Sequence, residues 1–149
     1  MLSVVILTFN SEKYLNEELE SAKFADEIIV VDSGSKDSTR QICDGFSSVK
    51  FHEQAWLGFG AQKQKGVDLA KNEWVFVLDS DEVITDELKN EIISTLKEPK
   101  FMAYNVARLN FFFGKAIKNM GLYPDYTVRL FNKNFAKFDG RAVHEKVIL

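Results

Sequence analysis

The first two thirds of the chain alternate short apolar runs with longer amphipathic segments. Three runs are rich in β-branched or aromatic residues and carry few charges, as buried parallel strands do: residues 2–7, 27–31 and 74–78. Residues 49–52 form a shorter candidate strand. Between the runs, apolar side chains recur at helical spacing, as at Leu15, Leu19 and Ala22. Strands that alternate with helices predict βαβ units, and therefore an α/β fold with a doubly wound, mostly parallel sheet.

Capping residues predict where the helices begin and end. Asn10 and Ser11 are candidate N-caps for the first helix, and residues 36–44 are a candidate second helix. Thr85 is expected to cap a later helix that Pro99 ends. Beyond Pro99 the helical signals fade. Two further strands are expected there, over residues 101–109 and 127–132, so the sheet should become mixed near its end.

The composition is that of one globular domain over residues 1–149, with 46% hydrophobic and 28% charged residues. The net charge of −3 conceals a division along the chain. Residues 1–98 hold 10 basic and 19 acidic side chains, a net of −9, whereas residues 99–149 hold 9 and 3, a net of +6. Such a basic end is either a solvated face or a surface for an anionic ligand or a membrane.

The single cysteine, Cys43, cannot form an internal disulfide, which favours a reducing, cytoplasmic setting. No apolar run approaches the ~18 residues of a membrane span, and the first residues lack the features of a signal peptide.

Polar residues follow three of the predicted strands, at the edge where open α/β sheets bind ligands. They are Thr8-Phe9-Asn10, Asp32-Ser33-Gly34-Ser35 and Asp79-Ser80-Asp81-Glu82. Asp32 has a simpler alternative role, since it can organise a turn. Three carboxylates within four residues repel one another, and a divalent cation would relieve this repulsion. Oxygen-only ligands favour Mg²⁺ or Mn²⁺ over zinc. No glycine-rich phosphate loop follows a strand, so metal and side chains would have to hold any nucleotide.

These motifs give the chain a family resemblance. It resembles inverting glycosyltransferases of family two, which have the GT-A fold and use nucleotide-sugar donors. Residues 3–10 are similar to the family's first strand, residues 31–39 to its D-x-G-S-x-D-x-T turn, and Asp79-Ser80-Asp81 to its D-x-D motif. The segments 58–63, 128–131 and 143–145 are similar to bacterial lipopolysaccharide-core β-glucosyltransferases.

The resemblance implies roles for particular residues. Residues 1–98 would bind the nucleotide sugar, most simply a UDP-hexose, and residues 99–149 would face the acceptor, a glycan or lipid-linked glycan of the cell envelope. The implied donor and metal site consists of Thr8, Phe9, Asn10 and Asp32 around the base, Asp79 at the ribose, Asp81 at a Mg²⁺ or Mn²⁺ ion, and Lys63 at a phosphate or the base. The general base would be Glu145, with Asp125 as the second choice.

Several alternatives stay open at this point. Lys63 can be a solvated helix residue, and Trp56 can stack on a sugar ring or be buried. Arg129 can steady a phosphate or an acidic acceptor, or it can pair with Asp125 or Asp139. Rival functions are a D-x-D phosphohydrolase, a nucleotidyltransferase, or a remnant that binds nucleotide sugar without transfer, because relatives in this family are typically longer at the C-terminus. Peripheral membrane contact and a homo-oligomer are further open expectations, and a nucleic-acid partner is not expected.

Overall fold

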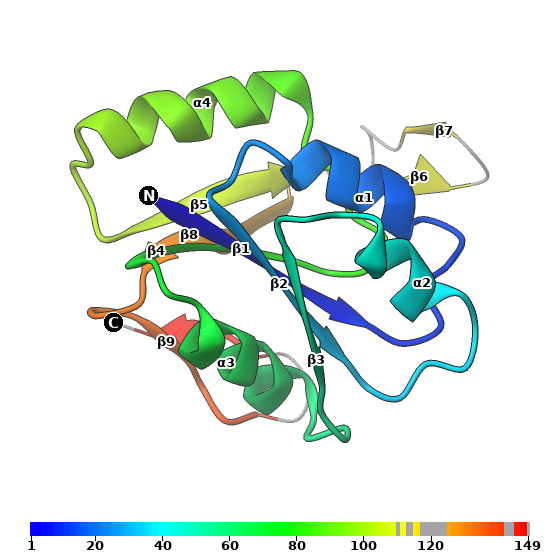
Figure 1. Cartoon of the computed structure of the whole chain (residues 1–149). Coiled ribbons are helices and arrows are strands. Elements are labelled where there is room, and N and C mark those ends of the chain that lie inside the picture. The colour runs from blue at the N-terminus through cyan, green and yellow to red at the C-terminus, as the bar shows by residue number, and fades with distance from the viewer. Residues whose placement is uncertain (110, 113–114, 117–124, 142–144, 149) are drawn as a thin grey trace.

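A computed structural model describes residues 1–109, 111–112, 115–116, 125–141 and 145–148 (Figure 1). The chain forms four helices among these residues: α1 (Leu15–Ala22), α2 (Thr39–Asp44), α3 (Phe59–Leu69) and α4 (Asp86–Lys97). The strands of the main sheet are β1 (Leu2–Thr8), β2 (Glu27–Asp32), β3 (Val49–Glu53), β4 (Trp74–Leu78), β5 (Ala103–Arg108) and β8 (Asp125–Asn132). Four short strands complete the set: β6 (Phe111–Phe112), β7 (Lys115–Ala116), β9 (Lys137–Phe138) and β10 (Val147–Ile148).

The main sheet has the order β3-β2-β1-β4-β8-β5. β1 pairs in parallel with β2 and β4, and β2 in parallel with β3. β8 runs antiparallel to both β4 and β5. The sequence-based prediction of a mostly parallel sheet that becomes mixed near its end is therefore confirmed.

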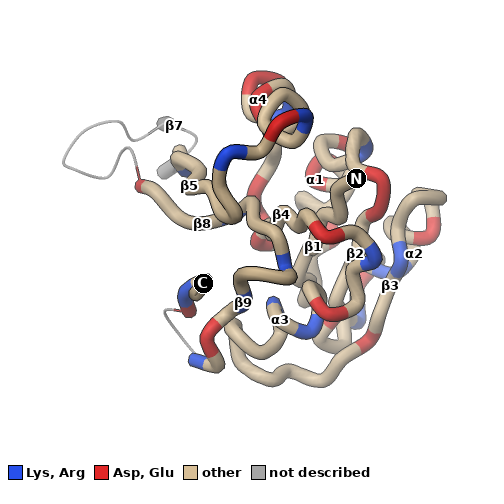
Figure 2. Tube along the Cα trace, turned by 90° about the vertical axis from the view of Figure 1, so that its left-hand side faces the viewer, with Lys and Arg blue, Asp and Glu red and all other residues tan. Residues whose placement is uncertain are grey.

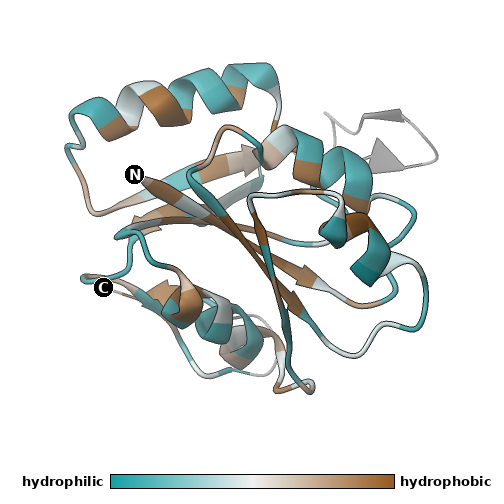
Figure 3. Cartoon of the chain, in the orientation of Figure 1, coloured by the Kyte–Doolittle hydropathy of each residue, from teal (hydrophilic) through white to brown (hydrophobic). Residues whose placement is uncertain are grey.

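Alternation along β1 and β2 sends apolar side chains to both faces of the sheet. Val4 and Ile6 join a core under α1, α2 and α4, whereas Val5 and Leu7 join a second core under α3 and β9. The ribbon accordingly has three layers, with α3 on the opposite face from the other helices (Figure 1). The brown, hydrophobic ribbon is concentrated along β1 and β2 in the middle of the sheet (Figure 3). Charges lie mainly on the helices and loops, and β1 and β4 carry none (Figure 2).

Helix α3 packs against the sheet at a glycine. A Cβ atom on Gly66 would lie 2.3 Å from Cγ1 of Val5, so only glycine permits this separation between helix and strand. The close packing fixes the start of α3 near the carboxyl ends of β1 and β2, where the chain places its polar residues.

The helix boundaries test the capping predictions. Thr85 accepts a hydrogen bond from the Leu88 amide and caps α4, as predicted. The prediction for α1 is wrong, since α1 begins at Leu15 with Tyr14 as its N-cap residue. Asn10 instead has a φ of 49° and takes part in contacts with the loop after β2, described below.

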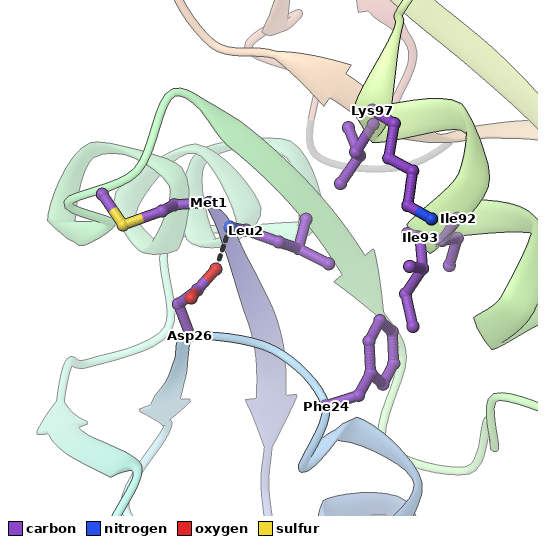
Figure 4. Close-up of a pocket in the computed structure, with 8 residues that line it drawn as sticks. Met1, Leu2, Phe24, Asp26, Ile92, Ile93 and Lys97 are labelled. Atoms are coloured by element: carbon purple, nitrogen blue, oxygen red, sulfur yellow. Dashed lines mark hydrogen bonds between the residues drawn. The ribbon is translucent and has the colours of Figure 1, made fainter.

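None of the described helices is long and apolar enough to cross a lipid bilayer. A hollow of about 200 Å³ lies between α4 and the first residues of β1, lined mostly by apolar side chains such as Phe24 and Ile93 (Figure 4). Its one carboxylate, that of Asp26, accepts a hydrogen bond of 2.7 Å from the Leu2 amide. This hollow is a gap in the packing between α4 and the sheet, at the end of β1 opposite to the polar strand ends.

Candidate active site

A larger pocket, of about 940 Å³, opens at the carboxyl ends of the parallel strands. It brings together the residues that follow β1 and β4 with the loop that precedes α3. Its lining comprises Leu7, Thr8, Phe9, Asn10, Ser11, Lys13, Tyr14, Ser33, Trp56, Phe59, Asp79, Ser80 and Asp81. Of the predicted donor residues, Thr8, Phe9, Asn10, Asp79 and Asp81 therefore share one pocket.

Asp32 lies beneath the pocket wall and holds the turn after β2 in place. One of its carboxylate oxygens accepts hydrogen bonds from the hydroxyls of Thr8, at 2.8 Å, and Ser35, at 2.5 Å. The other accepts from the amides of Gly34, at 2.9 Å, and Ser35, at 2.8 Å. Burial alone would raise the pKa of Asp32, but these donors outweigh burial and lower it. Asp32 is thus an ionised, 2% exposed residue that holds the Thr8 hydroxyl, and it does not belong to the pocket lining.

Asn10 ties the loop after β1 to the same turn. Its amide donates to Oγ of Ser35 at 2.8 Å, and its Oδ1 accepts from the Lys36 amide at 2.8 Å. These contacts account for the left-handed backbone of Asn10. They also project the neighbouring Phe9 into the pocket opening, where it remains 62% exposed.

The acidic turn after β4 separates its carboxylates. The amides of Asp81 and Glu82 donate to the Asp79 carbonyl at 2.8 and 3.0 Å, and the Asp79 amide donates to Oε2 of Glu82 at 3.0 Å. Asp79 and Glu82 consequently turn into the protein, whereas Asp81 is exposed at the pocket.

Arg129 and Lys63 neutralise the inward carboxylates. Nη2 of Arg129 lies 2.8 Å from Oδ2 of Asp79 and also contacts Glu82, while Nη1 donates to the Val77 carbonyl at 3.2 Å. Nζ of Lys63 lies 2.8 Å from Oδ1 of Asp79. Burial would raise the pKa of Asp79, but Arg129 and Lys63 lower it overall. For Glu82 burial prevails over Arg129, and the pKa is raised.

The same cations extend the pairing across the molecule. Seven side chains of alternating sign form a continuous series, which we call the ion-pair chain: Asp125, Arg108, Glu82, Arg129, Asp79, Lys63 and Glu145. The repulsion expected from the sequence is therefore offset by protein cations rather than left for a metal alone. Two open alternatives are settled as well. Lys63 is 4% exposed and not solvated, and Arg129 pairs with neither Asp125 nor Asp139.

The two candidate bases lie at opposite ends of the ion-pair chain. Lys63 donates to Oε1 of Glu145, so one ammonium links Glu145 to Asp79. Glu145 lies close to α3 at Gly60. A Cβ atom added to Gly60 would lie only 3.2 Å from the Cβ of Glu145. Asp125 pairs with Arg108, and both side chains are more than a third exposed.

Asp81 is the carboxylate best placed to hold a metal ion. No ion pair among the described residues involves it, and it faces the pocket. Within the described ranges, no group of three or more His, Cys, Asp or Glu side chains is arranged to hold a metal by itself. Mg²⁺ commonly binds through one or two carboxylates plus substrate phosphates, and a single free carboxylate beside an anionic ligand fits that pattern.

Sequence reasoning missed Glu18. This residue lies on the buried face of α1 with Leu15, Leu19 and Ala22, and neither of its carboxylate oxygens has a hydrogen-bond partner among the described residues. Burial, reinforced by the charges of Glu82, Asp81 and Asp79, raises the pKa of Glu18 to about 9. The signal that could have revealed it is its position, three residues after Leu15 on the apolar stripe of the helix.

Comparison with known proteins adds the family. The profile of Glycosyl transferase family 2 matches residues 3–144. The chain belongs to this family. A glycosyltransferase of Rickettsia typhi, RT0209, is 32% identical over 141 residues, which make up 92% of this chain and 48% of that protein. The lipopolysaccharide core biosynthesis glycosyltransferase LpsC of Rhizobium meliloti is 27% identical over 153 residues, covering 99% of this chain and 57% of LpsC.

Solved structures agree with the fold of this family 2 chain. Residues 1–349 of S. aureus TarS superpose with a TM-score of 0.69 at 22% identity, covering 94% of this chain and 50% of that structure. This likeness confirms the GT-A type of α/β fold. The chain spans about half the length of the curated relatives it matches.

The buried carboxyl of Glu18 predicts a pH-dependent stability. Its pKa is about 9 in the folded chain and near 4.5 when unfolded, so the folded state alone keeps the proton between these values. The free energy of unfolding should fall with rising pH by about 1.4 kcal/mol per unit through this window. Urea unfolding at pH 5 to 9 measures this dependence. Glu18→Gln should remove the contribution of Glu18 to the slope, so its unfolding free energy should exceed that of the parent by a margin that grows as the pH rises. The exposed Glu17→Gln is the matched control, and parallel curves for parent and Glu18→Gln would contradict the assignment.

Substitution of Arg129 should lower the free energy of unfolding more than substitution of Arg108, although both belong to the ion-pair chain. Arg129→Gln leaves the carboxylates of Asp79 and Glu82 without their buried cation, and should cost about 3 kcal/mol of unfolding free energy. Arg108→Gln breaks the pair with Asp125, whose members are 36% and 40% exposed, and a longer contact of 3.7 Å with Glu82, which keeps Arg129. It should cost less than about 1 kcal/mol. Urea unfolding at pH 7 compares the two, and equal losses would show that Arg129 does not anchor the acidic turn.

Proposed function

We propose that this chain is a metal-dependent glycosyltransferase domain that transfers a hexose from a nucleotide sugar with inversion, residues 1–98 binding the donor and residues 99–149 facing the acceptor. The supporting observation is the single pocket of about 940 Å³ that gathers Thr8, Phe9, Asn10 and the Asp79–Asp81 turn. Aromatic and amide groups on one side and acidic groups on the other suit a nucleoside with its hydroxyls. Family membership adds weight to this choice over a D-x-D phosphohydrolase.

The donor is a UDP-hexose in this proposal. Thr8, Phe9 and Asn10 contact the base, while Asp32 orients Thr8 and the turn amides. Asp79, held by Arg129 and Lys63, faces the ribose. Structures of S. aureus TarS with UDP-GlcNAc and with UDP support the choice of uridine. A mannosyltransferase of Pyrobaculum calidifontis was solved with GDP-Man and Mn²⁺, so a guanosine donor is the alternative to test.

Asp81 holds Mg²⁺ or Mn²⁺ in this proposal. The cation would neutralise the donor diphosphate and the charge that develops as it leaves. Glucosyl-3-phosphoglycerate synthase of Mycobacterium tuberculosis, solved with Mn²⁺ and UDP, supports a metal in this fold. The chain's own cations have a different task. Lys63, which the resemblance places at a phosphate or the base, lies outside the pocket lining and is bound to Asp79 and Glu145. In this proposal Lys63 and Arg129 fix the turn from which Asp81 projects.

Glu145 is our first choice for the general base. Inversion requires a group that takes the proton from the acceptor hydroxyl during attack on the anomeric carbon. Lys63 joins Glu145 to Asp79 and so places it next to the donor site. Asp125 remains the second choice, because Arg108 and Glu82 connect it to the other side of the same turn.

The acceptor is a cell-envelope glycan or lipid-linked glycan, such as a lipopolysaccharide core. The likeness to LpsC supports this class. We place the reaction at the cytoplasmic side of the membrane, with peripheral contact and self-association as further expectations. Binding of the donor without transfer is the alternative function.

Thermal shifts with nucleotide sugars test the donor and the metal together. UDP-glucose should raise Tm in the presence of Mn²⁺ and much less in its absence. At a UDP-glucose concentration of one hundred times Kd, the free energy of unfolding should increase by about 2.7 kcal/mol. GDP-mannose and ADP-glucose should have little effect. Asp81→Asn should lose the part of the shift that requires Mn²⁺, whereas the exposed Glu91→Gln should keep it. No shift with any nucleotide sugar, or an equal shift with all three, would overturn the proposal. Release of free sugar without transfer would favour the alternative function.

A further inference from the structure

The basic end of the chain keeps a surplus of lysines after its ion pairs are counted. All three side-chain carboxylates of residues 99–149 form ion pairs, which are Asp125–Arg108, Asp139–Arg141 and Glu145–Lys63. The remaining arginine, Arg129, is bound inside the protein. The lysines whose side chains the structure describes in this part form no ion pair with a described carboxylate: Lys100, Lys133, Lys137 and Lys146. Lysines therefore carry the surplus positive charge of residues 99–149.

These lysines lie at one end of the main sheet, opposite to the pocket. Figure 1 shows the end of α4, the start of β5, the end of β8 and the strand β9 at the left-hand end of the molecule, whereas β1 and β2 end on the right. The loop before β5 is joined to the end of β8, because the Asn132 amide donates to the Met102 carbonyl at 2.8 Å. Lys100 and Lys133, which lie within two residues of this contact in sequence, therefore belong to neighbouring loops.

The short hairpin of β9 and β10 adds two lysines and an apolar side chain. Its strands pair Phe138 with Val147 and Lys137 with Ile148. Phe138 and Val147 pack into the core under α3. Since side chains alternate along a strand, Lys137 and Ile148 point away from that core, and both are exposed. Lys146, directly before β10, is exposed as well.

Two phenylalanines lie uncovered among these lysines. Phe101 is 65% exposed and Phe135 is 59% exposed. The Tyr104 hydroxyl accepts hydrogen bonds from the amides of Lys100 and Phe101, at 2.9 and 3.0 Å, so the loop before β5 is held in a shape that leaves Phe101 outside. The Phe135 amide donates to the Asn132 carbonyl at 3.1 Å, which fixes this residue at the end of β8. We call the following exposed residues the basic aromatic patch: Lys100, Phe101, Phe135, Lys137, Lys146 and Ile148.

The chemistry of the basic aromatic patch fits an anionic lipid surface. Lysine ammonium groups attract anionic headgroups, and apolar side chains beside them gain free energy by entering the boundary between headgroups and acyl chains. A soluble anion would bind only the lysines and leave the apolar side chains in water. Glu73 and Glu98 are exposed in the adjoining loops, but the lysines of the patch outnumber them and the exposed Lys97 adds to the excess.

We propose that the basic aromatic patch docks this chain on a bilayer that contains anionic phospholipids. The patch gives the peripheral contact proposed above a surface and a lipid class, and its docking does not depend on the transfer reaction. The pocket opens at the opposite ends of the parallel strands, so a docked chain keeps its pocket accessible to ligands.

Co-sedimentation with lipid vesicles tests the patch. The parent should bind vesicles of equal parts phosphatidylcholine and phosphatidylglycerol at least about tenfold more tightly than vesicles of phosphatidylcholine alone, and added salt should weaken this binding. Phe101→Ala and Phe135→Ala should each weaken binding at least about threefold, because each removes a ring that enters the lipid. Lys137→Glu should weaken it at least about tenfold, because an attraction becomes a repulsion.

Matched control variants lie at the other end of the sheet. Tyr126→Ala removes a ring that is 63% exposed near the start of β8. Lys36→Glu makes the same change of charge as Lys137→Glu, at an exposed position in the turn after β2. Both controls should bind the anionic vesicles within about twofold of the parent, because charges farther than a Debye length from the lipid are screened.

The outcomes separate docking from the proposed function. If the parent binds both kinds of vesicle equally, or neither, or if the controls lose as much binding as the patch variants, the inference is wrong. If the parent self-associates without lipid in analytical ultracentrifugation and Phe101→Ala dissociates it, the patch is an interface between copies and the inference is also wrong. Calorimetric titration with UDP and Mn²⁺ should give the same Kd, within about twofold, for the parent and the patch variants. Failure of the parent to bind UDP would contradict the donor proposal and leave the docking result unaffected.

Discussion

The buried guanidinium of Arg129 is the contact on which the arrangement of the site depends. It comes from an antiparallel strand of the basic end of the chain and binds two carboxylates of the acidic turn after β4. The opposite net charges of the two parts of the sequence are therefore complementary within the fold. At least one cation of the basic end is used inside the protein and is not displayed to a ligand or membrane. These ion pairs and hydrogen bonds offset the cost of removing the Asp79 and Glu82 carboxylates from water, so both can lie partly buried beside the sheet.

This pairing divides the acidic motif into two kinds of carboxylate. Asp79 is fixed by Arg129 and Lys63, whereas Asp81 is left exposed at the pocket. A rigid turn with one free carboxylate can receive a metal with little rearrangement, because its supporting contacts are made before any ligand arrives. Through Lys63 the same turn is joined to Glu145, so donor and acceptor chemistry would share one rigid support.

Local signals were enough to predict most of the fold. Apolar runs predicted β1, β2 and β4 to within one or two residues, and Thr85 predicted the start of α4, because these features depend on neighbouring residues. The predicted start of α1 was wrong because Asn10 forms hydrogen bonds with residues 25 and 26 positions away in sequence. The partners of Arg129 could not be predicted for the same reason, since its two carboxylate partners are 50 and 47 residues distant in sequence. Strand ends located the pocket, but only three-dimensional packing could show which charges meet.

Anomalous diffraction at the manganese edge, from crystals grown with UDP and Mn²⁺, tests whether Asp81 binds the metal while Asp79 keeps its ion pairs. We expect one Mn²⁺ peak at the Asp81 carboxylate, with UDP in the pocket against residues 8–10 and Asp79 still bound to Lys63 and Arg129. A metal seated on Asp79 with these two contacts broken, or UDP bound outside the pocket, would contradict this expectation.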